Sequence, residues 1–148
     1  MGACGIASKR LTVRSIVVVI LTGSALLLSA QGVITPTTPR RGGNPVAAKR
    51  TNPVPKSPAS VEYGRRTYQR LCARCHGVAG KGDGGGAGAG GQPADLTDAT
   101  WDYGSTDGEI FSVIREGTSA DMESYAEQLS ETEIWNLVNF IRTFSEGR

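Results

Sequence analysis

The chain has 148 residues, of which 39% are hydrophobic and 6% aromatic. This length and composition allow one small domain with a tail, and they exclude a protein with a large apolar core. Residues 1–59 carry eight basic and no acidic side chains, whereas residues 60–148 carry eight basic and fourteen acidic ones, so the net charge of +2 results from two oppositely charged halves. The acidic second half excludes nucleic-acid binding, which requires a basic face.

A basic stretch followed by an apolar stretch opens the chain. Three basic residues precede an apolar run over residues 16–28, and Ala30-Gln31-Gly32 is a candidate cleavage site. This order is typical of a signal peptide, but the uncharged span 15–34 is also long enough to cross a bilayer, which takes roughly 20 residues. We predict that residues 1–34 are a signal peptide or an N-terminal membrane anchor. Either alternative places the following domain on the periplasmic side of the bacterial cytoplasmic membrane, anchored or soluble after cleavage.

Residues 35–59 form the second segment. Six of the seven prolines of the chain lie in it, separated by Gly, Thr and basic residues. Such a composition cannot bury a core of its own. It predicts a disordered, Pro-rich basic linker that leads to a domain over residues 60–148.

Helical periodicity begins after this segment. Apolar and small residues from Val61 to Cys75 recur at steps of three and four, which predicts a helix that ends near Gly77. Nine glycines over residues 77–91 then predict a loop.

Two further helices are indicated by capping boxes. Thr106 with Glu109 predicts one helix that starts after Thr106, and Ser130 with Glu133 predicts another that starts after Ser130. No run with strand periodicity occurs in the second half of the chain. We therefore expect an all-α domain in which long loops join short helices.

The most specific motif is Cys72-Ala73-Arg74-Cys75-His76, which matches the C-x-x-C-H pattern of c-type haem attachment. On a helical turn, two thiols at this spacing can each add to one vinyl group of the same porphyrin, and the adjacent imidazole can point at the iron. We expect one haem c per chain, bound covalently through Cys72 and Cys75, with His76 as an iron ligand.

Other interpretations of the cysteine pair are weaker. A structural zinc site needs four ligands, and outside the motif the chain offers only Cys4, in the N-terminal segment, and no second His. A thioredoxin-type dithiol would need a βαβ context. A disulfide between Cys72 and Cys75 stays open, because disulfides persist outside the cytoplasm.

A haem iron that transfers electrons normally takes a second axial ligand, and the candidate is Met122. It is the only Met besides the initiator, and His76 is the only His. A thioether suits ferrous iron and raises the reduction potential relative to a second His. The alternative is a Met that fills a gap in the core, but its neighbours in the sequence are polar.

With these motifs the chain resembles the class I c-type cytochromes, the mono-haem electron carriers of bacterial respiratory chains, over about residues 60–146. The segment from Gly64 to His76 is similar to the first helix of that family, and Glu133–Ile141 is similar to its last helix. The resemblance implies the small cytochrome c fold, wrapped around one covalent haem, in which these two helices cross closely at Gly64.

The resemblance also implies several residues that contact the haem. Met122 with Tyr125 is similar to the distal segment of the family, although Glu123 replaces the usual Pro. Pro93 lies in a segment similar to one whose proline carbonyl accepts the second N–H of the proximal histidine; the alternative is that it only ends a loop. Trp101 and Tyr103 lie in a loop from which family members bond a haem propionate, with core packing as the alternative.

The expected function is therefore the transfer of single electrons in a respiratory or dehydrogenase-linked chain, without catalysis. The expected partners are membrane or periplasmic redox proteins (a dehydrogenase, an oxidase or a quinol-oxidising complex), and the membrane itself if the N-terminal segment is retained. The alternative is a haem subunit of a redox enzyme whose open distal position binds peroxide, NO or O2. That alternative applies if Met122 does not ligate the iron.

Overall fold

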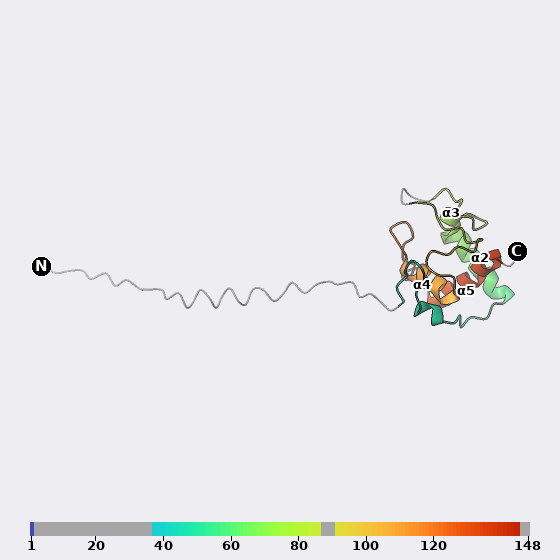
Figure 1. The fold of residues 1–148 in the computed structure, drawn as a ribbon, viewed down its shortest axis with the longest axis horizontal. Helices are drawn as coiled ribbons and strands as arrows, with labels where there is room; N and C mark the ends of the chain where they lie inside the picture. Colours follow the sequence, from blue (N-terminus) through green and yellow to red (C-terminus); the bar gives the residue numbers. More distant parts are fainter. Residues whose placement is uncertain (2–36, 87–90, 146–148) are drawn as a thin grey trace. The chain divides into compact units, whose positions relative to one another are not determined.

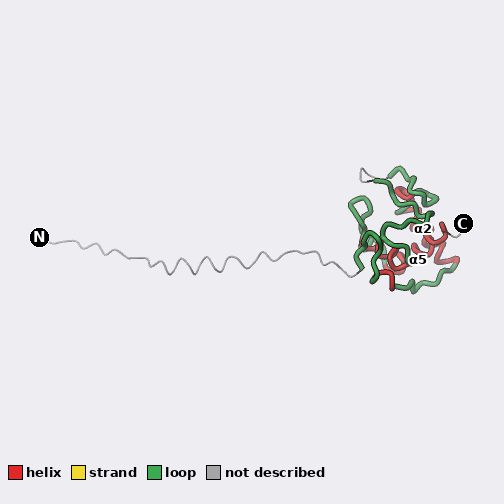
Figure 2. The backbone as a smooth tube through the Cα atoms, in the orientation of Figure 1, coloured by secondary structure: helices red, strands yellow, loops and turns green. Residues whose placement is uncertain are grey.

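The computed structural model describes residues 1, 37–86 and 91–145, and their ordered elements are all helical. In chain order they are η1 (Ala47–Lys49), α2 (Pro58–Leu71), α3 (Ala73–His76), α4 (Asp107–Glu116), α5 (Glu131–Ile141) and η2 (Arg142–Ser145), where η marks a 3-10 helix. Long loops join these short helices, and the described residues contain no strand (Figures 1 and 2). The expected all-α fold is confirmed.

Helices α2 and α5 pack closely against each other. Helix α2 starts with Pro58 and is capped by Ser57, whose hydroxyl accepts a hydrogen bond from the Ser60 amide at 3.2 Å. A Cβ added to Gly64 would lie 2.1 Å from the backbone oxygen of Asn136 on α5. Glycine at this position therefore allows the two backbones to approach, as the resemblance implied.

Both predicted capping boxes are present. The Thr106 hydroxyl accepts a hydrogen bond from the Glu109 amide while the Glu109 carboxylate accepts one from the Thr106 amide, and Ser130 and Glu133 repeat this exchange at α5. The Glu133 carboxylate also accepts a hydrogen bond from the Tyr63 hydroxyl. These hydrogen bonds lower the pKa of Glu133 to about 2, and the bond from Tyr63 has the largest effect.

The core lies where α2, α4 and α5 meet. Its fully buried side chains include Tyr68, Phe111, Ile134, Leu137 and Val138. The rings of Phe111 and Trp135 stack with centroids 4.1 Å apart, which joins α4 to α5. Burial of these large side chains supplies the main driving force for folding of the domain.

Residues 37–57, which we call the N-terminal strap, are folded onto the helices. Ala47 of η1 is completely buried, and a Cβ added to Gly108 of α4 would lie 2.0 Å from the Ala47 carbonyl oxygen. The backbone N–H of Asn44 donates a hydrogen bond to Oε1 of Glu109 at 2.9 Å. Farther along, Nδ2 of Asn52 donates to Oδ1 of Asn139 on α5 at 2.9 Å.

The prediction of a disordered linker over residues 35–59 is therefore wrong for residues 37–59. The strap has no core of its own, as its composition indicated, but it uses the core of the helices. The Arg50 guanidinium lies 4.2 Å from the centroid of the Phe111 ring and 3.4 Å from a carboxylate oxygen of Glu131. Asparagine side chains of the strap bond α5 and the strap's own turns, so its polar groups gain partners in the folded state.

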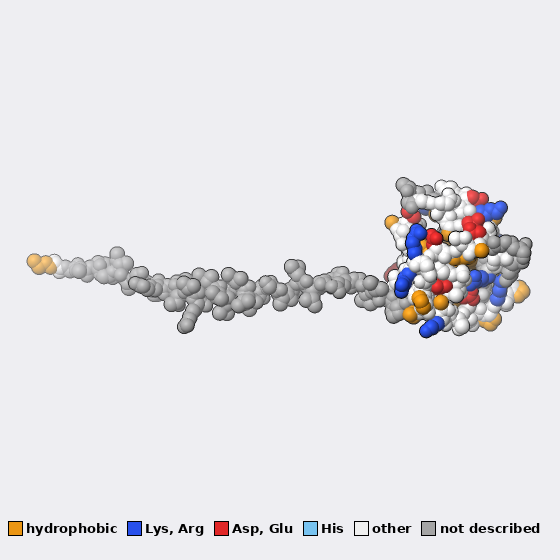
Figure 3. Space-filling view, in the orientation of Figure 1, with side chains coloured by type: hydrophobic (Ala, Val, Ile, Leu, Met, Phe, Trp, Pro, Cys, Tyr) orange, Lys and Arg blue, Asp and Glu red, His pale blue; other side chains and the backbone are white. Residues whose placement is uncertain are grey.

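The predicted signal peptide or membrane anchor, residues 1–34, lies almost entirely outside the described residues, because residues 2–36 are not among them. Among the described residues, no helix combines the length and apolar character that a membrane crossing requires. On the face shown in Figure 3, acidic and basic side chains of the domain are intermixed.

Candidate functional site

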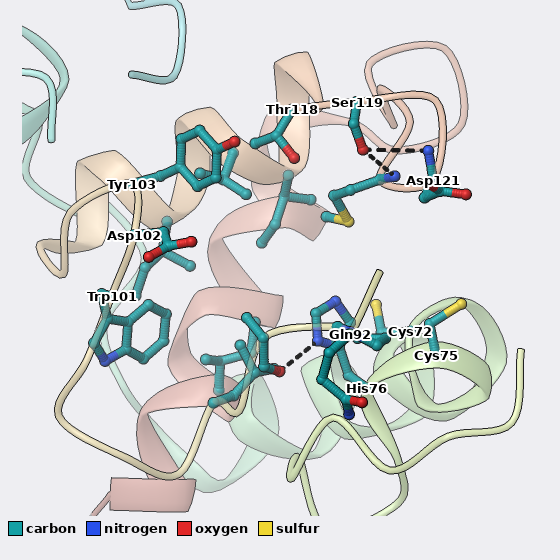
Figure 4. Close-up of a pocket in the computed structure, with 18 of the residues that line it drawn as sticks. Cys72, Cys75, His76, Gln92, Trp101, Asp102, Tyr103, Thr118, Ser119 and Asp121 are labelled. Carbon is teal, nitrogen blue, oxygen red and sulfur yellow. Dashed lines mark hydrogen bonds between the residues drawn. The ribbon is translucent and has the colours of Figure 1, made fainter. Parts of the chain in front are cut away.

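One short helical turn carries the two thiols and the imidazole. The chain bends at Cys72, which ends α2 and precedes α3, and the His76 amide donates to the Cys72 carbonyl at 2.9 Å. This turn places the side chains of Cys72, Cys75 and His76 next to one another on one side of a cavity (Figure 4). Cys72 and Cys75 are free thiols, so the alternative disulfide between them is not formed.

The cavity has a volume of about 350 Å³ and is bounded by α2, α3, α4, α5 and three loops. Much of its wall is apolar and consists of Leu71, Leu96, Ile110, Val113, Ile114 and Ile141. Apolar walls exclude water and fit the flat, largely apolar body of a porphyrin. Burial raises the pKa of the Cys72 thiol to about 12, and the electrostatic effect of the neighbouring Cys75 makes a smaller contribution in the same direction.

The imidazole of His76 is held by a backbone carbonyl. Its Nδ1 lies 3.0 Å from the carbonyl oxygen of Ala94, to which it donates a hydrogen bond when protonated. Such a bond fixes the tautomer and leaves Nε2 as the ligating atom. The resemblance implied the Pro93 carbonyl as the acceptor, and this detail is wrong by one residue. The Pro93 carbonyl is turned towards Gly82 instead, where it would lie 2.3 Å from an added Cβ.

The glycine-rich loop has a role that the sequence analysis missed. Three of its glycines, Gly82, Gly84 and Gly86, donate their amides to the carbonyls of His76, Cys75 and Arg74 at 2.9, 3.1 and 2.9 Å. These carbonyls belong to α3 and have no partner within so short a helix. A Cβ at Gly84 would lie only 2.4 Å from the Arg74 oxygen, so the loop needs glycine to come this close. The loop thus holds the attachment turn in place.

Met122 lines the same cavity and is half-buried. Its carbonyl accepts hydrogen bonds from the amides of Thr118 and Ser119 at 2.9 and 3.3 Å, and its amide lies 3.2 Å from the Ser119 hydroxyl oxygen. In Figure 4, Thr118, Ser119 and Asp121 lie across the cavity from Cys72, Cys75 and His76. These hydrogen bonds hold the loop although Glu123 stands where the resemblance expects a Pro.

Trp101 and Tyr103 also line the cavity. The Trp101 indole N–H donates to the Asp98 carbonyl at 3.3 Å, a long bond that can be exchanged for a closer acceptor. The sequence analysis did not include Arg41 of the N-terminal strap, whose side chain reaches the same wall and pairs with Asp102 at 3.3 Å.

The residues of this cavity fit a covalently bound haem. Two thiols and one imidazole lie on a single turn, the imidazole is oriented by a carbonyl, and a thioether comes from a separate loop. Among the described residues, no group of three or more His, Cys, Asp or Glu side chains is arranged to hold a metal ion directly.

Comparison with known families gives one match over more than half of the chain. The family described as "Cytochrome C oxidase, cbb3-type, subunit III" matches residues 59–141. This range contains Cys72, Cys75, His76 and Met122, and it begins just after the N-terminal strap.

Three solved structures are similar to this chain, and two of them are named as cytochromes. A chain of the Kuenenia stuttgartiensis reducing HAO-like protein complex Kustc0457/Kustc0458 is 27% identical with a TM-score of 0.58, over 63% of this chain and 47% of that one. Cytochrome cL from Methylophaga aminisulfidivorans MPT is 20% identical with a TM-score of 0.50, over 69% of this chain and 59% of that one. The KustC0563 c-type cytochrome is 34% identical with a TM-score of 0.48, over 55% of this chain and 96% of that one. The chain thus spans about half the length of the first of these structures.

Proposed function

Because the chain belongs to the c-type cytochrome family described as cytochrome c oxidase, cbb3-type, subunit III, and so binds haem c covalently, we propose that it carries single electrons with His76 and Met122 as the axial ligands of the iron. One haem per chain follows from the single attachment motif. When bound, the haem supplies a one-electron iron couple.

The observation that carries this proposal is the convergence of four side chains on one cavity. Cys72, Cys75 and His76 reach it from one turn, and Met122 reaches it from the loop between α4 and α5. With His76 and Met122 both as ligands, the iron would have no open position for a substrate, which favours electron transfer over binding of peroxide, NO or O2.

The protein's part in electron transfer is to hold its ligands still and to keep water out. The Ala94 carbonyl fixes the ring of His76, and the Ser119 hydroxyl and the Thr118 amide fix the backbone of Met122. Ligands that are held in both oxidation states need little rearrangement when the electron moves. The apolar wall from α4 lowers the local dielectric, which favours the ferrous state, because iron, porphyrin ring and neutral ligands together carry less net charge in that state.

The partner that we propose is a redox protein outside the cytoplasm. The family name, and a neighbour that is part of a redox complex, support an electron donor or acceptor such as a dehydrogenase, an oxidase or a quinol-oxidising complex. The N-terminal basic and apolar stretches support location on the periplasmic side of the membrane. Cell fractionation together with N-terminal sequencing of the mature protein tests the location and distinguishes cleavage from a retained anchor.

The axial ligation is tested by replacing Met122 with Leu. Leucine keeps the size and apolar character of the side chain but removes the sulfur. We expect M122L to abolish the weak near-infrared sulfur-to-iron absorption band of the ferric protein and to lower the reduction potential. Glu123→Gln in the same loop is the matched control and should keep the band. An M122L protein with an unchanged band and potential would remove Met122 as a ligand and reopen the alternative of an open distal position.

A further inference from the structure

The N-terminal strap, which precedes the residues matched by the family, contributes a side chain to the haem cavity. Among the described residues that line this cavity, Arg41 is the only Lys or Arg. Its guanidinium lies 3.3 Å from Oδ2 of Asp102 and 5.8 Å from the centroid of the Tyr103 ring. A positive charge is therefore held at one part of the cavity wall.

The position of Arg41 is set by the backbone of the strap. The amide of the next residue, Gly42, donates to the Asp102 carbonyl at 2.7 Å. Three residues after Arg41, the Asn44 amide donates to the buried carboxylate of Glu109 at 2.9 Å. These two bonds, both just after Arg41 in the sequence, keep its backbone beside the wall formed by Trp101, Asp102 and Tyr103, and the ion pair with Asp102 holds the guanidinium there.

This wall lies away from the attachment turn. Figure 4 shows Trp101, Asp102 and Tyr103 on the side of the cavity opposite to Cys72 and Cys75. In haem c, the two pyrrole rings that form thioethers lie on the edge opposite the two rings that carry propionates. A haem tethered at Cys72 and Cys75 would therefore direct its two carboxylates towards the wall that holds Arg41.

We propose that Arg41 is the cationic partner of the haem propionates and that it raises the reduction potential of the site; this inference rests on the proposed haem-binding function. A guanidinium presents five N–H donors in a fixed fork that matches carboxylates, and Arg41 shares this fork between Asp102 and the propionates. Its positive charge favours the ferrous site, which carries one negative charge more than the ferric site. The Arg41 side chain is 76% exposed, so solvent and salt screen this effect and keep it modest.

The test is a redox titration of haem-loaded variants against a dye of known potential. We expect R41Q to lower the equilibrium constant for reduction by about two- to tenfold, where tenfold equals 59 mV for one electron. R40Q is the matched control, because it removes the same charge one residue earlier from a side chain that does not line the cavity, and it should shift the constant by less than half as much. D102N removes a negative charge from the same wall and should shift the constant upwards.

Thermal unfolding of the same samples separates this role from a purely structural one. R41K keeps the charge and should restore at least half of the R41Q shift. R41Q with a lower melting temperature but an unchanged potential would overturn the inference, as would equal shifts in R41Q and R40Q. If R41Q does not fold, R41K and D102N decide: no shift in D102N refutes the inference. A wild-type chain without covalent haem would refute the proposed function itself, a result that is distinct from any of these.

Discussion

Replacement of Gly64 by Ala tests the close approach of α2 and α5 on which the shape of the site depends. The added Cβ would lie 2.1 Å from the Asn136 oxygen and 2.8 Å from Cβ of Phe140. The first distance is about 1.3 Å short of ordinary contact, and its partner is helix backbone that no rotamer change can move. Overpacking costs typically 1–3 kcal/mol, and the rigid partner places this case near about 3 kcal/mol. Alanine regains about 1 kcal/mol of helix propensity, so the net loss is about 2 kcal/mol.

The assay is thermal unfolding followed by far-ultraviolet circular dichroism. For a domain of about 100 residues, about 2 kcal/mol lowers the melting temperature by roughly 8–16 °C. Gly85→Ala is the matched control, because an added Cβ there meets nothing within 4 Å and its φ is not positive. If G64A melted within a degree or two of G85A, the close crossing of α2 and α5 would not be a constraint and the reasoning would fail.

Three more predictions follow from the site and the strap. Ser119→Ala removes the hydroxyl that accepts a hydrogen bond from the Met122 backbone amide, so we expect a weaker near-infrared sulfur-to-iron band and a larger fraction of protein in which Met122 does not ligate the iron. Ser119→Thr keeps a hydroxyl and should restore the band. Bands of equal strength in the two variants would contradict this role of the loop. Burial alone would raise the pKa of Glu109, but hydrogen bonds at the start of α4 lower it, so the stabilising effect of its carboxylate is present above about pH 4.5 and is lost as the pH falls. Glu109→Gln should therefore flatten the decline in unfolding free energy from about pH 6 to about pH 3. If unfolding free energies from urea titrations fell with pH as steeply in this variant as in the wild type, the reasoning would be refuted. Arg50→Ala removes the guanidinium that lies over the Phe111 ring, and it should lower the free energy of unfolding by about 1–2 kcal/mol and speed proteolysis at residues 37–57. An unchanged rate of proteolysis would mean that the strap is held without Arg50.

The helices and the attachment turn could be predicted because their signals are local. A capping box needs only Thr106 and Glu109, three residues apart, and the spacing C-x-x-C-H alone predicts the chemistry of Cys72, Cys75 and His76. The structure places both where the sequence indicated. Met122 as a ligand stays a prediction, because its presence at the cavity agrees with ligation without testing it.

The strap and two details of the site could not be predicted because their partners are distant in the sequence. Asn44 and Glu109, which join the strap to α4, are 65 residues apart, and composition contains no information on such a pair. The choice of the Ala94 rather than the Pro93 carbonyl for His76 depends on backbone angles that residue type does not determine. Arg41 gave no signal either, since an Arg in a basic, Pro-rich segment is ordinarily solvated.

The measurement that tests the central claim most directly is the intact mass and visible spectrum of the mature protein, made in a host that can attach haem c. The account predicts one added haem mass per chain, and a haem spectrum that stays with the polypeptide after denaturation and solvent extraction. A colourless chain of unmodified mass, in which Cys72 and Cys75 both react with a thiol reagent, would contradict the account.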